Sequence, residues 1–200
     1  MTSHPKLLSV SIMAVSLTIL AGCQQQADKN MPPPVAMTEE AVGHFCQMNI
    51  LEHPGPKAQI HLEGLPYPLF FSQVRDGIAY ERMPEQNYKI SAVYVSDMSM
   101  ARDWDDVGRE NWIPASTAYY VVASSKVGGM GAPELVPFSD LDDARKFVAR
   151  HGGEVVRLDD ITDVLVLNSA PITPSANTRE TATLPDDDDY RARLEKLRKE

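Results

Sequence analysis

The sequence is poor in cysteine and in positive charge. Its 200 residues contain only 2 cysteines, so they offer no pairs at the finger-like spacing of a structural zinc site. No acid-rich loop has the regular ligand spacing of a calcium site. Acidic residues outnumber Lys and Arg by 28 to 19, whereas nucleic-acid binding requires basic patches. We therefore expect no nucleic-acid partner.

Near the N-terminus, an apolar run is too short to span a bilayer comfortably. Residues 7–20 follow Lys6 and precede Ala21-Gly22-Cys23, a pattern typical of an export signal. The end of this run, Leu20-Ala21-Gly22-Cys23, resembles the bacterial lipobox, in which the cysteine is acylated and becomes the mature N-terminus. We therefore predict a signal peptide at residues 1–22 and a lipid on Cys23. The alternative is an ordinary signal peptide that contains a cysteine.

Export leaves Cys46 without an obvious partner. The protein is then expected to be periplasm-facing. Gln24, in place of an Asp, implies the outer membrane by resemblance to other bacterial lipoproteins. Cleavage removes one lysine and no acid, which changes the net charge from −9 to −10. An unpaired thiol in an oxidising compartment needs an explanation. A Cys23–Cys46 disulfide is the rival account, and the lipobox argues against it.

Composition divides the chain into tether, folded part and tail. Residues 23–38 form a lipid anchor and a polar, Pro-rich tether. The folded part is predicted at about residues 39–168. Residues 169–200 are predicted to be a disordered acidic linker followed by a short charged helix.

The folded part contains a repeat. Residues 71–80 and 138–147 share the pattern Phe-Ser-x-aliphatic-x-Asp-x-x-x-aromatic, in which Ser72 and Ser139 are candidate helix caps. Asp142, three residues after Ser139, fits a capping box. The apolar patterns that flank the two helices predict the following strands: 45–51, 58–62 and 90–95 in the first half, and 118–123, 134–137 and 154–158 in the second. The fold class is therefore α+β, with two related ββαβ units at residues 39–98 and 99–168.

The strand predicted at residues 45–51 suggests a metal site. Cys46 and Met48 would point to one face, because side chains alternate along a strand. A thiolate beside a thioether is a soft pair that selects Cu(I). Candidates for a further ligand are Met130, exposed by three neighbouring glycines, His53 before a Pro-Gly-Pro turn, and His61 on the next strand. Met98 and Met100 rank below these candidates.

These residues also carry a family resemblance. Cys46-x-Met48 is followed by His53-Pro54-Gly55-Pro56-Lys57-Ala58-Gln59-Ile60, and later by Tyr94-Val95-Ser96-Asp97 and the Met130-Gly131 loop. This pattern resembles the NosL family, the accessory lipoprotein of nitrous oxide reductase in denitrification. The resemblance implies a membrane-anchored Cu(I) chaperone, not an enzyme, which delivers copper for the reductase's copper centres with a membrane-bound assembly transporter. It also implies a fold similar to that of organomercurial lyase.

Two other functions stay open at this point. A thiol-dependent enzyme related to organomercurial lyase would use Cys46 as nucleophile and His44 as base. Such a lyase would want further cysteines, which the chain lacks. A non-metal assembly lipoprotein would keep its function after Cys46→Ser.

Overall fold

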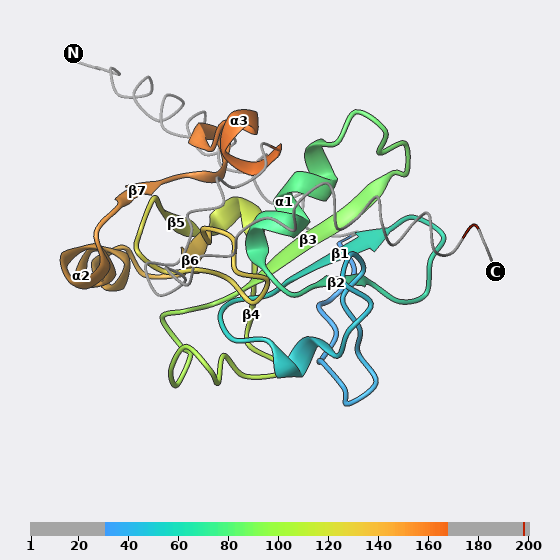
Figure 1. Ribbon diagram of the computed structural model, residues 1–200, viewed down its shortest axis with the longest axis horizontal. Coiled ribbons are helices and arrows are strands. Elements are labelled where there is room, and N and C mark those ends of the chain that lie inside the picture. The colour runs from blue at the N-terminus through green and yellow to red at the C-terminus, as the bar shows by residue number, and fades with distance from the viewer. Residues whose placement is uncertain (1–30, 168–197, 199–200) are drawn as a thin grey trace, which may run out of the picture. The chain divides into compact units, whose positions relative to one another are not determined.

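The computed structural model describes residues 31–167 and Arg198 (Figure 1). The predicted signal peptide, Cys23, the first part of the tether and nearly all of the predicted tail lie outside the described residues. By its contacts the chain divides into two compact parts, residues 1–168 and 169–200. Both predicted ββαβ units lie in the first part. Within the described part, no helix has the length and apolar character needed to cross a membrane.

The first half forms a four-stranded antiparallel sheet with one helix. Its elements are β1 (Ala58–Leu62), β2 (Leu69–Phe71), α1 (Val74–Arg82), β3 (Ile90–Ser96) and β4 (Trp112–Pro114). The strand order is β2-β1-β3-β4, so the chain returns through α1 to the other side of β1. Figure 1 shows α1 lying across this sheet.

The second half repeats this topology. Its elements are β5 (Tyr119–Val122), β6 (Val136–Phe138), α2 (Leu141–His151) and β7 (Glu154–Val156), followed by the short α3 (Asp163–Leu167). The strand order β6-β5-β7 corresponds to β2-β1-β3, and all pairs are antiparallel. The predicted α+β class is thus confirmed, and each half has the order strand, strand, helix, strand. β4 of the first sheet lies beyond the boundary predicted between residues 98 and 99.

The assignment of the first two strands was wrong in the first unit, whereas the strands predicted at residues 118–123 and 134–137 of the second unit correspond to β5 and β6. Residues 45–51 do not form a strand; the counterpart of β5 is β1, and the counterpart of β6 is the short β2. Two local features prevent a strand at residues 45–51. Gln47 has a left-handed backbone (φ 55°), and the Asn49 side chain accepts the Leu51 N–H and starts a 3₁₀ turn at Ile50–Glu52.

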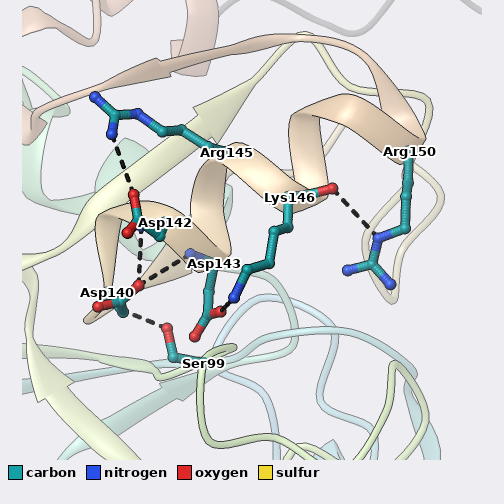
Figure 2. Close-up of polar contacts among 7 residues, drawn as sticks. All are labelled: Ser99, Asp140, Asp142, Asp143, Arg145, Lys146 and Arg150. Carbon is teal, nitrogen blue, oxygen red and sulfur yellow. Dashed lines mark hydrogen bonds and ion pairs between the residues drawn. The ribbon is translucent and has the colours of Figure 1, made fainter.

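The predicted serine caps and the capping box were also wrong, because each helix begins one residue later than expected. The N-caps are Gln73 and Asp140, not Ser72 and Ser139. Figure 2 shows the Asp140 carboxylate at the start of α2, where it accepts the N–H groups of Asp142 (2.9 Å) and Asp143 (3.0 Å). Asp142 therefore receives no bond from Ser139; instead its carboxylate pairs with Arg145.

One apolar core joins the two units. Alternate residues of β1, such as Ala58 and Ile60, face α1 and are completely buried. The same cluster includes Tyr120 of β5, whose hydroxyl donates to the Ala115 carbonyl (2.8 Å). A second cluster, centred on Phe138 and Phe147, packs α2 against β5 and β6. The shared core fixes the loops of one unit relative to those of the other.

The end of the predicted tether is packed against the domain. The Gln59 side chain forms two hydrogen bonds with the Val35 backbone (2.9 and 3.0 Å), and Met37 is only 2% exposed. The Tyr94 hydroxyl donates to the Pro32 carbonyl (2.7 Å). Gln59 and Tyr94 are paired across β1 and β3 and alternate with the core residues. Residues 32–37 therefore cover the face of the first sheet opposite α1.

Candidate metal site

Cys46 and Met48 lie in a tight turn, residues 43–48, which we call the thiol turn. The Gly43 N–H donates to the Met48 carbonyl (2.9 Å), and the Gln47 N–H donates to the Gly43 carbonyl (2.8 Å). The turn is attached to β2 because the His44 N–H donates to the Phe70 carbonyl (2.6 Å). The period-two argument for the two sulfurs was therefore wrong, although one short segment still carries both.

The Cys46 thiol is held beside the start of α1. It is free and half-buried, and its sulfur lies 3.2 Å from the Ser72 hydroxyl oxygen. Gly43 leaves the space for this contact. A β-carbon at that position would come within 2.5 Å of the Cys46 sulfur and 2.8 Å of Ser72 Oγ. The glycine is thus required by close packing around the thiol.

Met130 lies in the β5–β6 connection, on the segment 127–133 that we call the methionine loop. A bridge between Val127 and Pro133 closes the loop, and the Gly128 N–H donates to the Ala132 carbonyl (2.8 Å). The Met130 N–H donates to the Gln73 side-chain oxygen (3.0 Å), while the Met130 side chain stays 44% exposed.

The methionine loop reaches the same part of the first unit as Cys46. A β-carbon at Gly129 would come within 3.0 Å of the Ser72 carbonyl oxygen and 2.6 Å of the His53 β-carbon. Cys46 contacts the Ser72 side chain, and Met130 binds the adjacent Gln73. Cys46 and Met130 are 84 residues apart by their numbering. The fold therefore brings both into contact with the neighbouring residues Ser72 and Gln73.

His53 is held against the methionine loop with one ring nitrogen free. Its Nδ1 lies 3.0 Å from the Gly129 carbonyl oxygen. Because a carbonyl can only accept, this bond places a proton on Nδ1, so in the neutral tautomer the lone pair is on Nε2. Nε2 is buried and has no hydrogen-bond partner within residues 31–167. One ring nitrogen bonded to a backbone carbonyl and the other without a partner is the usual arrangement of a metal-binding histidine.

His61 is placed differently. It lies on β1, and its Nε2 is 3.0 Å from Gln59 Oε1, on the sheet face that residues 32–37 cover. Its ring packs edge-on against Tyr94, and burial lowers its pKa below the ordinary value. The structure does not bring this histidine to the thiol turn.

The lower-ranked methionines are also separate from the thiol turn. Met98 donates its N–H to the Pro137 carbonyl (2.9 Å) and packs in apolar clusters of both units, while Met100 is 74% exposed.

Two buried ionisable side chains support the loops around the site. Lys57 is 2% exposed and donates through Nζ to the carbonyls of His53 (2.7 Å), Pro54 (3.2 Å) and Gly55 (2.5 Å). Burial lowers the pKa of Lys57 to about 8, against the favourable charge of Glu134. Lys57 thereby fixes the Pro-Gly-Pro turn that carries His53.

Glu134 directly follows the methionine loop and is bonded to backbone N–H groups. It is 2% exposed, and its Oε1 accepts the N–H groups of Arg75 (3.0 Å) and Leu135 (2.9 Å). Burial raises the pKa of Glu134 to about 8. Sequence reasoning missed the role of both Lys57 and Glu134. The available signal was a charged residue placed directly beside a buried strand, which is costly unless the charge is satisfied.

A metal site here needs methionine sulfur. Within residues 31–167, no three side chains of the His, Cys, Asp or Glu type gather closely enough to hold a metal ion. Carboxylate and mixed zinc-type sites are therefore not formed by the described residues. The segments that carry the Cys46 thiol, the Met130 thioether and the His53 imidazole meet around Ser72, Gln73 and Gly129.

The fold and site define a class of protein: a duplicated α+β domain that presents a lone thiol, a thioether and an imidazole from three loops. The NosL family model matches residues 34–166, and the chain belongs to this family. The chain is 51% identical over 187 residues to the copper-binding lipoprotein NosL of Achromobacter cycloclastes, with 93% of each chain covered. It is 31% identical over 163 residues to the copper-binding lipoprotein NosL of Stutzerimonas stutzeri, covering 80% of this chain and 83% of the relative.

A solved structure supports the same conclusion. The crystal structure of the copper chaperone NosL from Shewanella denitrificans matches with a TM-score of 0.61 and 34% identity, over 66% of this chain and 98% of that one. The predicted family is thus confirmed. None of the relatives' names denotes an enzyme, in agreement with the prediction that this protein is not one.

Proposed function

We propose that this protein is a lipid-anchored carrier of Cu(I) that supplies the copper centres of nitrous oxide reductase during denitrification. Its curated relatives are named copper-binding lipoproteins, and a structural relative is named a copper chaperone. The observation that carries the proposal is the convergence of the thiol turn and the methionine loop on Ser72 and Gln73.

The donor set suits monovalent copper. Soft thiolate and thioether sulfur select Cu(I) over harder divalent ions, and imidazole is compatible with both. We assign Cys46, Met130 and His53 as ligands, with Met48 of the same thiol turn beside them. His61 was a candidate from sequence, but its bond to Gln59 ranks it last.

The exposure of the site suits a carrier. Met48 and Met130 are each 44% exposed, so a partner protein can reach the sulfur atoms that hold the metal. Binding displaces the proton of the Cys46 thiol, since the thiolate is the metal ligand. Cu(I) is then cargo held by few ligands, which permits ligand exchange with an acceptor.

The proposal includes a cellular location. Acylation of Cys23 anchors the domain to the membrane on the periplasmic side, and Gln24 favours the outer membrane. The partners are nitrous oxide reductase and its membrane-bound copper-centre assembly transporter. These assignments rest on the lipobox and on the family, because Cys23 lies outside the described residues.

The test is an anaerobic Cu(I) titration against a competing chelator. We expect one tightly bound Cu(I) in the wild-type protein, loss of this site in Cys46→Ser, and weaker binding in Met130→Ala, His53→Ala and Met48→Ala. Met100→Ala and His61→Ala are matched controls with unchanged affinity. Unchanged binding in Cys46→Ser would reject the assignment of the site.

A second measurement separates binding from delivery. Reductase matured in cells that carry Cys46→Ser should lack copper, as it should in cells without this protein. Full copper loading of the reductase in those cells would contradict the proposed role, whatever the titration shows.

A further inference from the structure

The two repeats begin their helices in different ways. In the second unit, the N-cap Asp140 binds the N–H groups of its own helix (Figure 2). Gln73 occupies the same position of the repeat, yet its side chain accepts no N–H of α1. Its amide oxygen accepts the Met130 N–H (3.0 Å), and its amide nitrogen donates to Asp76 (2.9 Å). The acceptor that would cap a helix is therefore directed to the methionine loop.

The first turn of α1 is instead capped by a residue next to the methionine loop. Glu134 directly follows the methionine loop, and its Oε1 accepts the Arg75 N–H in the first turn of α1 (3.0 Å). The carboxyl group is buried, as expected for a group that satisfies helix N–H donors inside the protein. Each segment thus supplies an acceptor to the other: Gln73 to Met130, and Glu134 to Arg75.

Gly128 allows the two acceptors to come together. A β-carbon at Gly128 would overlap Glu134 Oε2 and lie 2.6 Å from Gln73 Oε1. Gly129 packs as closely on Ser72 and His53, and Gly131 has a left-handed backbone (φ 79°) with open space around it. A loop with three glycines loses much conformational entropy when it is ordered, so it needs fixed contacts to hold one geometry.

We propose that Gln73 and Glu134 form a reciprocal clamp that positions Met130 for Cu(I), with Gln73 as the positioning residue that acts on the Met130 backbone. This inference rests on the proposed function. Without the clamp, the exposed Met130 side chain would sample many positions. The Met130 sulfur would then be lost from the ligands that bind the metal together with Cys46. The clamp also accounts for the difference between the two helices: Asp140 caps its own helix, whereas Gln73 binds the methionine loop.

The test is a double-mutant cycle in the Cu(I) titration. Gln73→Leu removes the acceptor at similar volume, and we expect it to weaken Cu(I) binding about three- to tenfold, the range of one lost hydrogen bond. In a Met130→Ala background the same change should have no further effect. X-ray absorption of the Cu(I)-loaded Gln73→Leu protein should show the same loss of a sulfur neighbour as Met130→Ala.

Controls separate positioning from general stability. Asp140→Ala removes the equivalent N-cap of α2, and it should lower the unfolding temperature while Cu(I) affinity stays at the wild-type value. If Gln73→Leu does not fold, Gln73→Asn serves in its place, because its shorter side chain keeps the amide but cannot reach the Met130 N–H.

The outcomes distinguish this inference from the proposed function. Loss of binding in Cys46→Ser together with wild-type affinity in Gln73→Leu overturns the clamp alone. Additive effects of Gln73→Leu and Met130→Ala overturn it too, as does unchanged affinity in Met130→Ala. Retained binding in Cys46→Ser instead overturns the proposed function.

Discussion

The Cys46 sulfur lies 3.2 Å from the Ser72 hydroxyl oxygen, at the junction between β2 and α1. Ser72 is 2% exposed, so the hydroxyl has little water to bind and its position is fixed by the core. Ser72 was predicted to be a helix cap; its side chain instead meets the thiol.

Removal of this hydroxyl should affect Cu(I) binding. We expect Ser72→Ala to weaken Cu(I) affinity about two- to fivefold and to lower the unfolding free energy by about 1 kcal/mol, the usual net value of one hydrogen bond. Chelator competition and urea unfolding measure the two effects. Ser139→Ala is the matched control, since this repeat counterpart is exposed. Equal affinities for Ser72→Ala and wild type would show that the hydroxyl does not influence the metal site.

Gly43 should tolerate no side chain. A β-carbon there would crowd the Cys46 sulfur and Ser72 Oγ, so we expect Gly43→Ala to cost about 1–3 kcal/mol of stability and to weaken Cu(I) binding. Thermal unfolding and the Cu(I) titration provide the readouts. In the control Gly64→Ala, the added methyl group meets nothing within 4 Å, and only backbone strain at φ 83° remains. Normal Cu(I) binding by a Gly43→Ala protein would contradict the packing argument.

The buried Glu134 should make stability depend on pH. Burial raises its pKa from 4.5 to about 8. Between these values the folded protein holds a proton that the unfolded chain has released, so this contribution is fully present below pH 4.5 and is lost as pH rises towards 8. We expect Glu134→Gln to remove this loss of stability between pH 4.5 and 8. Urea unfolding at a series of pH values tests this, and parallel curves for the two proteins would refute it.

Met37 should contribute to the stability of the domain, although composition placed it in a tether. It is 2% exposed and packs in a cluster with Ile50 and Val107. Met37→Ala should therefore cost about 2–4 kcal/mol, as buried methionines do. Met100→Ala, at a residue that is 74% exposed, should change the unfolding free energy by less than about 0.5 kcal/mol. Equal unfolding free energies for the two variants would show that the packed segment does not stabilise the domain.

The fold was predictable where local pattern and repetition agreed. Phe71 and Phe138 end equivalent strands, and the helices that follow them were visible in the spacing of their apolar residues. The pattern failed at residues 45–51, because alternation alone does not reveal the left-handed backbone of Gln47. It also missed β2, which has only three residues and follows closely on Pro66 and Pro68.

The candidate site was predictable in its donors but not in its support. Cys46 and Met130 stood out by residue type and by neighbouring glycines. By contrast, the bond from Arg75 to Glu134 spans 59 residues, and no local pattern indicates which N–H a distant carboxylate will satisfy. His53 and His61 looked equivalent in sequence, and only tertiary contacts separate a free ring nitrogen from one bound to Gln59.

The thiol turn belongs to the first ββαβ unit and the methionine loop to the second. An ion bound by both segments would therefore connect the two units. Such a ligand stabilises the state that binds it by mass action. Hydrogen exchange in both segments should then slow on loading, and the empty protein becomes the more easily opened form. Release of the ion and local opening of the two segments are therefore thermodynamically coupled. An acceptor that separates the two segments would thereby lower the affinity for the ion it is about to receive.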